Sequence, residues 1–300
     1  MPLQKIKDKN TKEIVYEAYQ SKTVVPAFNI PYLPMITPIV QALKDIDSFG
    51  LIQVARLEWT KFEARSLEAV AKEYYLNASI KHTRLHLDHV PVIDEDGERI
   101  DFLEILKRAL KSGYESLMID GSRLPLEDNI KFTSKACEIA HNGGVPIEAE
   151  LGAVMGHETG PLPPYDELFN SGKGFTDISQ AKKFVDETNV DWLSIAIGNV
   201  HGAISGILKN QKKVSARLDI QRLKEINSAL RIPLVLHGGS GIQVNYIQEA
   251  IKNGISKINI GTNIRQPYVK TLQETGNVNK AQDSVYKTVI DIMKNELKTI

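Results

Sequence analysis

Eight short apolar or β-branched runs alternate with segments of helical periodicity, and this alternation limits the fold more than any other feature of the sequence. The predicted strands cover residues 24–30, 51–56, 83–89, 116–121, 147–152, 192–198, 234–239 and 257–261. Helical patterns between them include residues 101–112, 128–141, 179–188, 219–229 and 244–253. Eight strand–helix repeats in 300 residues are typical of an α/β (β/α)8 TIM barrel. A doubly wound open sheet is the alternative, but it leaves two or more strands unexplained.

Three segments depart from the repeat. Residues 153–176 follow the fifth strand and are rich in glycine and proline, so they predict a long loop of the kind that often serves function. Residues 202–217 predict a second long loop, which carries several lysines. A C-terminal helix is expected over residues 281–300, where an apolar stripe covers the barrel or meets a partner subunit. Because no segment has the composition of a linker, one domain over residues 1–300 is predicted.

The overall charge and the single cysteine narrow the classes of function. Lysine plus arginine and aspartate plus glutamate number 37 each, which predicts no nucleic-acid or anionic-membrane partner. The lone Cys137 excludes an intramolecular disulfide and a cysteine-based zinc site. No run approaches the ~20 apolar residues of a membrane helix, and the N-terminus lacks the apolar region of a signal peptide. We therefore expect a soluble, cytoplasmic protein.

Titratable and amide side chains gather where the predicted strands end. In a (β/α)8 barrel these C-terminal strand ends carry the chemistry. The residues there are Asn29, Arg56, Glu58, Asp88, His89, Asp120, Glu150, Asn199, His201, His237 and Asn259. The run from Leu85 to Val90 alone holds two histidines and an aspartate, which is costly to bury unless a metal or a charge partner receives them.

Three histidines fall at the ends of the third, sixth and seventh strands. A single histidine at such a position is usually structural, but His89, His201 and His237 would share one rim of the barrel. Three imidazoles with one open position are typical of a catalytic zinc site. Calcium or magnesium would prefer a shell of oxygen ligands.

Two glycine-containing loops predict a phosphate site. The segment from His237 to Gly241 reads HGGSG, and the segment from Asn259 to Asn263 reads NIGTN. Glycines let backbone N–H groups crowd an anion, and the loops after strands seven and eight of such barrels commonly bind phosphate.

With these motifs the sequence resembles the class II, metal-dependent fructose- and tagatose-bisphosphate aldolases. The resemblance extends from Val25 to Asn263. It is carried by Val25-Pro26-Ala27-Phe28-Asn29, His86-Leu87-Asp88-His89, Met118-Ile119-Asp120-Gly121-Ser122, Glu148-Ala149-Glu150-Leu151-Gly152, Gly198-Asn199-Val200-His201-Gly202, the HGGSG loop and Asn259-Ile260-Gly261-Thr262. It implies a lyase that cleaves a phosphorylated ketose into dihydroxyacetone phosphate, or a related ketone, and an aldehyde. This is a reaction of carbohydrate metabolism such as glycolysis.

The resemblance also implies a role for each site residue. His89, His201 and His237 would bind catalytic Zn²⁺, with Glu150 as a further metal residue and a possible second cation shared with Asp120. Asp88 would be the acid/base, Glu158 in the long loop would move the proton of the enediolate, and Asn259 would orient the substrate. Substrate and phosphate contacts would come from Asn29, Arg56, Gly202, Gly238, Gly239, Ser240 and Thr262. A homodimer or homotetramer is expected.

The chemistry of aldol cleavage agrees with these roles. Zn²⁺ is a Lewis acid that stabilises the charge left on the ketone fragment, and a neighbouring carboxylate can move the hydroxyl proton. An imine mechanism needs a lysine at a C-terminal strand end. Lys257 is predicted to begin the eighth strand, at the wrong end of the barrel, so this mechanism is disfavoured.

Two departures from the family pattern concern substrate binding. Ala55 stands where the family has a serine, and Ser205 stands where it has a phosphate-binding lysine. Arg56 or a lysine of the 202–217 loop could supply the missing charge. We therefore expect an altered substrate preference.

Two other functions remain open alternatives. A metal-dependent hydrolase would need an HxH pair at the first strand, which ends Phe28-Asn29-Ile30. A non-catalytic phosphosugar-binding barrel would not need both Asp88 and Glu158.

Overall fold

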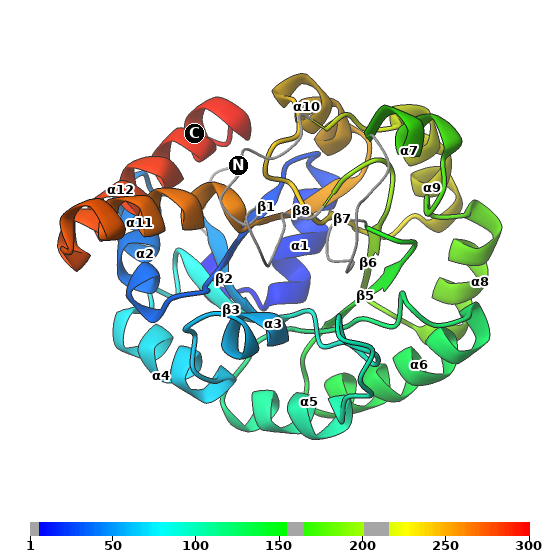
Figure 1. Ribbon diagram of the computed structural model, residues 1–300. Helices are drawn as coiled ribbons and strands as arrows, with labels where there is room; N and C mark the ends of the chain where they lie inside the picture. Colours follow the sequence, from blue (N-terminus) through cyan, green and yellow to red (C-terminus); the bar gives the residue numbers. More distant parts are fainter. Residues whose placement is uncertain (1–5, 155–164, 201–215) are drawn as a thin grey trace.

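Eight parallel strands form the centre of the molecule in a computed structural model that describes residues 6–154, 165–200 and 216–300. The strands are β1 (Val25–Asn29), β2 (Gly50–Ala55), β3 (Thr83–Asp88), β4 (Leu117–Ile119), β5 (Ile147–Leu151), β6 (Trp192–Ile195), β7 (Leu234–Leu236) and β8 (Ile255–Ile260). Their order is β3-β2-β1-β8-β7-β6-β5-β4. A bridge between His86 and Ser116 joins β3 to β4, so the sheet nearly closes into a barrel (Figure 1). The predicted TIM barrel is confirmed, and the open sheet was the wrong alternative.

Helices surround the barrel, and local caps begin many of them. They are α1 (Thr11–Gln20), α2 (Ile36–Asp45), α3 (Arg56–Thr60), α4 (Leu67–Asn77), α5 (Phe102–Lys111), α6 (Leu126–Asn142), α7 (Tyr165–Ser171), α8 (Ile178–Thr188), α9 (Ile220–Leu230), α10 (Val244–Lys252), α11 (Thr262–Thr275) and α12 (Val278–Asp291). The side chains of Asn10, Ser66, Asp101, Asp177 and Asp219 each accept a hydrogen bond from the first turn of the helix that follows. The five helices predicted above are confirmed to within two residues at each end.

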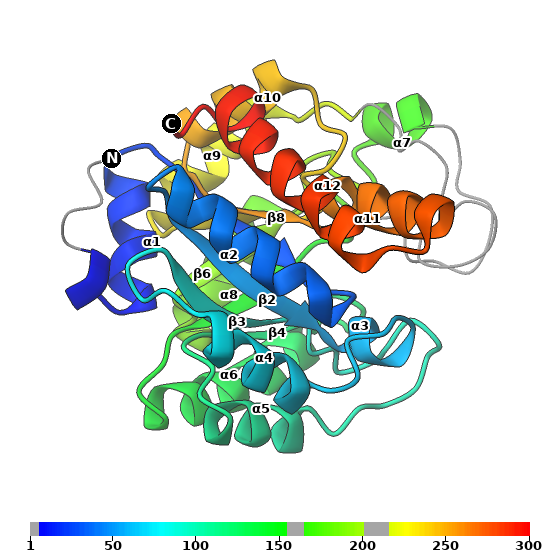
Figure 2. The same cartoon turned by 90° about the vertical axis from the view of Figure 1, so that its left-hand side faces the viewer.

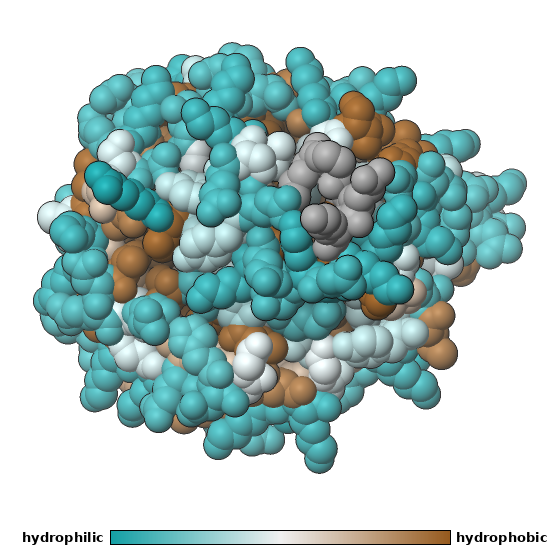
Figure 3. Space-filling view, turned by 180° about the vertical axis from the view of Figure 1, so that it is seen from behind, coloured by the Kyte–Doolittle hydropathy of each residue, from teal (hydrophilic) through white to brown (hydrophobic). Residues whose placement is uncertain are grey.

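Two apolar layers hold the barrel together. The larger one fills the space between the sheet and the outer helices. The smaller one fills the inside of the barrel, where Trp192 and Val235 pack with Ile14, Val15 and Ala18 of α1. Helix α1 thereby closes the N-terminal end of the barrel, opposite the face seen in Figure 1. That closed face is mostly hydrophilic, with small apolar patches (Figure 3).

Two segments differ from the sequence-based expectation, and most of the predicted loop 202–217 lies outside the described residues. The predicted loop 153–176 contains α7, because Phe169 packs against Tyr165 and Phe175. The predicted C-terminal helix begins earlier, as α12, and continues as a π-helical turn over Ile292–Glu296. Its buried Val285 and Val289 pack on the apolar layer around the sheet. Among the described helices, none has both the length and the apolar character needed to cross a membrane.

Candidate active site

Asp88 is the buried centre of a hydrogen-bond network at the end of β3. Its Oδ2 accepts hydrogen bonds from Asn29 Nδ2 at 2.9 Å and from Gln53 Nε2 at 3.3 Å. Its Oδ1 accepts a hydrogen bond from Asn259 Nδ2 at 2.9 Å. These donors lie on β1, β2 and β8, whose parallel register brings their ends together. The structure therefore brings together three predicted site residues, Asn29, Asp88 and Asn259.

The surroundings of Asp88 keep its carboxylate ionised. Burial raises the pKa of Asp88, but the positive charges of His89, Lys257 and His237 outweigh this effect and lower it to about 2. Every hydrogen bond described above is donated to the carboxylate, which favours the charged form further. At neutral pH, Asp88 is therefore ready to accept a proton.

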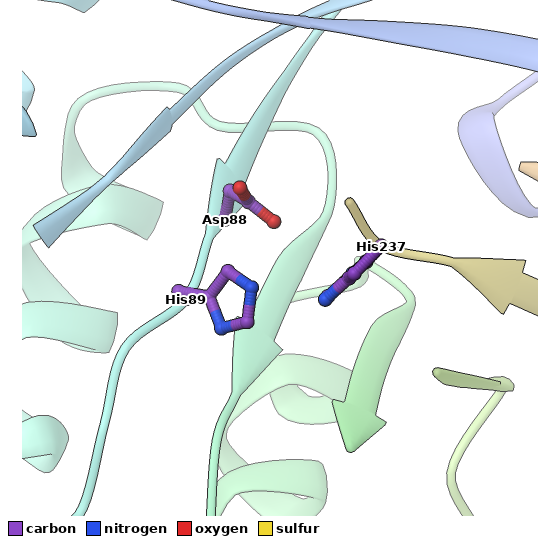
Figure 4. Close-up of side chains that lie close together, drawn as sticks. All are labelled: Asp88, His89 and His237. Carbon is purple, nitrogen blue, oxygen red and sulfur yellow. The ribbon is translucent and has the colours of Figure 1, made fainter. Parts of the chain in front are cut away.

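His89 and His237 face one another beside Asp88 (Figure 4). His89 directly follows β3 with a φ of 22°, a conformation that non-glycine residues seldom adopt and that is found in strained functional sites. Its Nδ1 donates to Asp120 Oδ2 at 3.0 Å. His237 follows β7, and its Nε2 lies 2.7 Å from Glu148 Oε1 while its Nδ1 lies 2.8 Å from Glu150 Oε2. The two ring centroids are 4.4 Å apart.

The donor atoms around these histidines suit a zinc-type cation. Potential ligand atoms of Asp88, His89 and His237 lie within 4.8 Å of one another. Burial lowers the pKa of His89, but the charges of Asp88 and Asp120 raise it to about 10, so this pocket attracts positive charge. Imidazoles supported by carboxylates are the usual ligands of zinc. The residues present therefore fit the metal that the sequence predicts.

The other predicted metal residues lie around this group. In the described part of the chain, the second group of close potential ligands is His86, Asp88 and Glu148, and neither group includes Asp120 or Glu150. Each of these two carboxylates instead contacts a different histidine of the first group. The predicted residues His201, Glu158 and Gly202 lie outside the described residues.

The two glycine-containing loops meet at the start of α11. Gly238 has a φ of 63°, and a Cβ on Gly239 would lie 2.5 Å from Ile258 Cγ2, so both positions favour glycine. The buried Ser240 Oγ accepts a hydrogen bond from Asn263 N at 3.3 Å. Thr262 is the first residue of α11, whose N-terminal N–H groups favour an anion. The structure therefore brings Gly238, Gly239 and Ser240 close to Thr262, and their contact with phosphate stays a prediction.

Several polar residues inside the described part of the barrel were not predicted as site residues. They include Gln53, Glu148, Ser194 and Lys257, all of which have zero exposure. Two of them precede a predicted site residue by two positions on the same strand: Glu148 precedes Glu150, and Lys257 precedes Asn259. Because alternate residues of a strand share a face, this spacing was a signal in the sequence. The same spacing puts His86 on the inner face below Asp88, where its Nδ1 lies 2.8 Å from Ser116 Oγ.

The prediction for Lys257 needs a correction. Lys257 is the third residue of β8, not its beginning, and its Nζ reaches Glu148 Oε2 at 2.9 Å and Asn259 Oδ1 at 2.7 Å. The amine is thus directed toward the site rather than away from it. It is held as an ammonium in a buried ion pair, which leaves it unsuited to imine formation.

Two charged side chains, Arg56 and Glu58, follow the end of β2, and the arginine is paired with a carboxylate. Arg56 begins α3 rather than ending the strand, and its Nη1 is 3.0 Å from Asp94 Oδ2. Glu58 is buried, and its Oε2 accepts hydrogen bonds from Ala55 N at 2.8 Å and from Asn29 Nδ2 at 3.5 Å. Burial raises the pKa of Glu58 to about 8, and the nearby charge of Asp88 acts in the same direction.

Glu58→Gln should make the stability of the protein less dependent on pH. The folded-state pKa of about 8 exceeds the ordinary 4.5, so the folded protein keeps a proton that the unfolded chain releases between these values. Wild-type stability therefore falls as pH rises through this window. As pH rises from 5 to 9, the free energy of unfolding of the wild type should fall by about 1–3 kcal/mol more than that of the variant. Urea unfolding at the two pH values measures this, and parallel pH profiles for both proteins would contradict it.

Comparison with known proteins places this arrangement among aldolases. The family model described as "Fructose-bisphosphate aldolase class-II" matches residues 9–300. The fructose-bisphosphate aldolase of Helicobacter pylori (strain J99) is 31% identical over 300 residues, covering 92% of this chain and 90% of that protein. The fructose-bisphosphate aldolase of Staphylococcus epidermidis (strain RP62A) is 31% identical over 272 residues, covering 90% and 86%. The solved structure of the YdjI aldolase from Escherichia coli K12 superposes with a TM-score of 0.73 at 26% identity, covering 94% and 95%.

Proposed function

Because the chain belongs to the class II fructose-bisphosphate aldolase family, and is thus a lyase, we propose that it cleaves a phosphorylated ketose by a zinc-dependent retro-aldol reaction. The products would be dihydroxyacetone phosphate, or a related ketone, and an aldehyde. The observation that carries this proposal is the ionised Asp88 held beside the facing rings of His89 and His237. Nothing in the comparisons supports the non-catalytic alternative.

His89 and His237 would hold the metal, with His201 as the third predicted ligand. When bound, Zn²⁺ supplies a Lewis acid that polarises the ketone oxygen. Asp120 would orient His89 through Nδ1 and Glu148 would orient His237 through Nε2, while Glu150 lies 2.8 Å from His237 Nδ1, the nitrogen that would face the metal. A second cation between Asp120 and Glu150 stays a prediction.

Asp88 would take the proton from the substrate hydroxyl on the carbon–carbon bond that breaks. Its three amide donors hold the carboxylate in place and stabilise its charge before the reaction. After cleavage Asp88 carries that proton and returns it in the reverse, condensing direction. Glu158 stays the predicted carrier of the proton that the ketone fragment takes up.

The substrate phosphate would bind where the loop from Gly238 to Ser240 meets the start of α11. Backbone N–H groups, the Ser240 hydroxyl and Thr262 at the helix N-terminus form a set of donors suited to an anion. Gly202 stays a further predicted contact.

The substrate preference would differ from that of a standard bisphosphate aldolase. Ala55 has no hydroxyl to offer, Arg56 is paired with Asp94, and Glu58 places an acid beside Asn29. A second phosphate near the end of β2 would thus meet no unpaired base among these three residues. If Arg56 binds substrate, it must share its guanidinium with Asp94.

A cleavage assay over ketose mono- and bisphosphates tests the proposed function. We expect release of an aldehyde from at least one ketose phosphate, with a chelator abolishing the reaction. A higher kcat/KM for fructose 1,6-bisphosphate than for every monophosphate would contradict the altered preference. Tight binding of ketose phosphates without cleavage of any would overturn the aldolase proposal. A homodimer or homotetramer, measurable by sedimentation velocity, and a cytoplasmic location stay predictions.

A further inference from the structure

Lys257 is a fully buried cation in the middle of the barrel, one layer below the site. Its ammonium contacts two oxygens, Glu148 Oε2 at 2.9 Å and Asn259 Oδ1 at 2.7 Å. An ammonium so deep in a barrel needs compensation, and Glu148 supplies the opposite charge. The contact with Asn259 is not needed for charge balance, and it links the ammonium to a residue that contacts Asp88.

The contact with Lys257 fixes the orientation of the Asn259 amide. A lysine ammonium can only donate hydrogen bonds, so the atom of Asn259 that faces it must be the oxygen. The amide nitrogen is then directed to Asp88 Oδ1, to which it donates at 2.9 Å. Lys257 thus keeps Asn259 a hydrogen-bond donor to the proposed acid/base, whether or not Asp88 carries a proton.

A second branch of the network leads from Lys257 to His237. Glu148 Oε2 lies 2.9 Å from the ammonium and accepts a hydrogen bond from Trp192 Nε1 at 2.7 Å. Its other oxygen, Oε1, lies 2.7 Å from His237 Nε2. A carboxylate at this distance places the ring proton on Nε2 and leaves Nδ1 as the nitrogen available to a metal. Lys257 keeps Glu148 ionised and in place for this contact.

The same ammonium explains the second group of close ligand atoms. His86, Asp88 and Glu148 together would suit a cation, and His86 Nε2 lies 3.8 Å from Glu148 Oε2. Lys257 already brings a positive charge to that carboxylate oxygen. The Lys257 ammonium therefore takes the place of a metal ion beside His86, Asp88 and Glu148.

We propose that Lys257 is a positioning residue that couples the two halves of the site, through Asn259 to Asp88 and through Glu148 to His237. The inference rests on the proposed function, because it gives Asp88 and His237 their roles. Lys257 itself would touch neither the substrate nor the metal.

A double-mutant cycle between Lys257 and Asn259 tests the first branch. Lys257→Met and Asn259→Ala should each lower kcat about 10- to 100-fold, because both act on the reacting carboxylate, and Lys257→Met should change KM less than about threefold, because Lys257 touches no substrate. Assayed at saturating zinc, so that the second branch does not contribute, the double variant should be no slower than the slower single variant, since both changes remove the path to Asp88. Multiplying effects would overturn the proposal. If Lys257→Met does not fold, Lys257→Gln is measured instead: its amide keeps a donor for Asn259, so its kcat should fall less than about threefold, and a loss as large as that of Asn259→Ala would overturn the first branch.

Zinc affinity tests the second branch without any assay of turnover. Competition with a chromophoric chelator should show about tenfold weaker zinc binding by Lys257→Met, because Glu148 no longer holds His237 firmly. Unchanged affinity would overturn this branch. The matched control is Lys12→Met, which breaks a lysine–carboxylate pair with Asp191 (2.6 Å) at the other end of the barrel. It should lower thermal stability but not zinc affinity or kcat. If the wild-type protein cleaves no ketose phosphate, the proposed function is wrong. The zinc affinities would still show whether Lys257 supports His237 through Glu148.

Discussion

Asp88→Asn should lower the turnover of ketose cleavage by about 10²- to 10⁴-fold, the range expected for loss of a general base. An asparagine cannot take up the hydroxyl proton. It also presents an N–H₂ group to a site whose neighbours, Asn29, Gln53 and Asn259, already donate. The amide of Asn259 cannot turn to accept, because Lys257 holds its oxygen. Steady-state kinetics and zinc content measure the effect, and zinc should stay bound.

The matched control for this change is Asp191→Asn. Asp191 is also a buried aspartate with several partners, including His141 Nε2 at 2.9 Å and Ile147 N at 2.8 Å, but it lies at the closed end of the barrel. This variant should lose stability and keep its kcat per folded molecule. If Asp88→Asn keeps more than about a tenth of wild-type turnover, Asp88 is not the acid/base.

Removal of the metal should abolish cleavage and lower the thermal stability of the protein. Asp88, Asp120 and Glu150 lie around His89 and His237, so without a cation their negative charges are compensated only by protons and the neighbouring basic groups. A ligand present at 100 times its Kd stabilises the folded state by about 2.7 kcal/mol, and chelation removes this contribution. The melting temperature from calorimetry and the cleavage activity should both fall on chelation and both recover when zinc is restored.

His237→Ala should resemble the chelated protein and should not recover when zinc is added. His141→Ala is the matched control, because His141 also pairs with a carboxylate, Asp191, but does so far from the site. It should keep both zinc and activity. Cleavage that persists in the presence of a chelator would exclude the zinc mechanism. Recovery with another divalent ion but not with zinc would show that the enzyme uses a metal other than zinc.

Much of the site could be predicted because parallel barrels place strand ends together. The sequence predicted eight strands, so Asn29, Asp88, His237 and Asn259 were expected on one rim, and the structure brings these four together. The glycine-containing loops were likewise expected beside each other, and Ser240 does contact Asn263. The position of Arg56 was less predictable, because the sequence does not show whether this residue ends β2 or begins α3.

The residues that sequence reasoning missed lie one layer deeper. Glu148 and Lys257 are close only because β5 and β8 curve around the same axis, and no spacing along the chain relates residues 109 positions apart. Moving the predicted start of β8 by two residues was enough to direct Lys257 to the wrong end of the barrel. Strand boundaries are set by pairing with neighbouring strands, which local patterns do not contain.

The sequence by itself determined the barrel, the rim on which the chemistry lies and the kind of side chains found there. These follow from hydrophobic periodicity and from the topology of parallel strands, which local patterns are sufficient to reveal. Only the tertiary structure decided which partner each polar group has: Asp94 for Arg56, Glu148 for His237, and Lys257 for Asn259. Burial makes each unsatisfied polar atom costly, so these pairings are set by packing in three dimensions and not by distance along the chain.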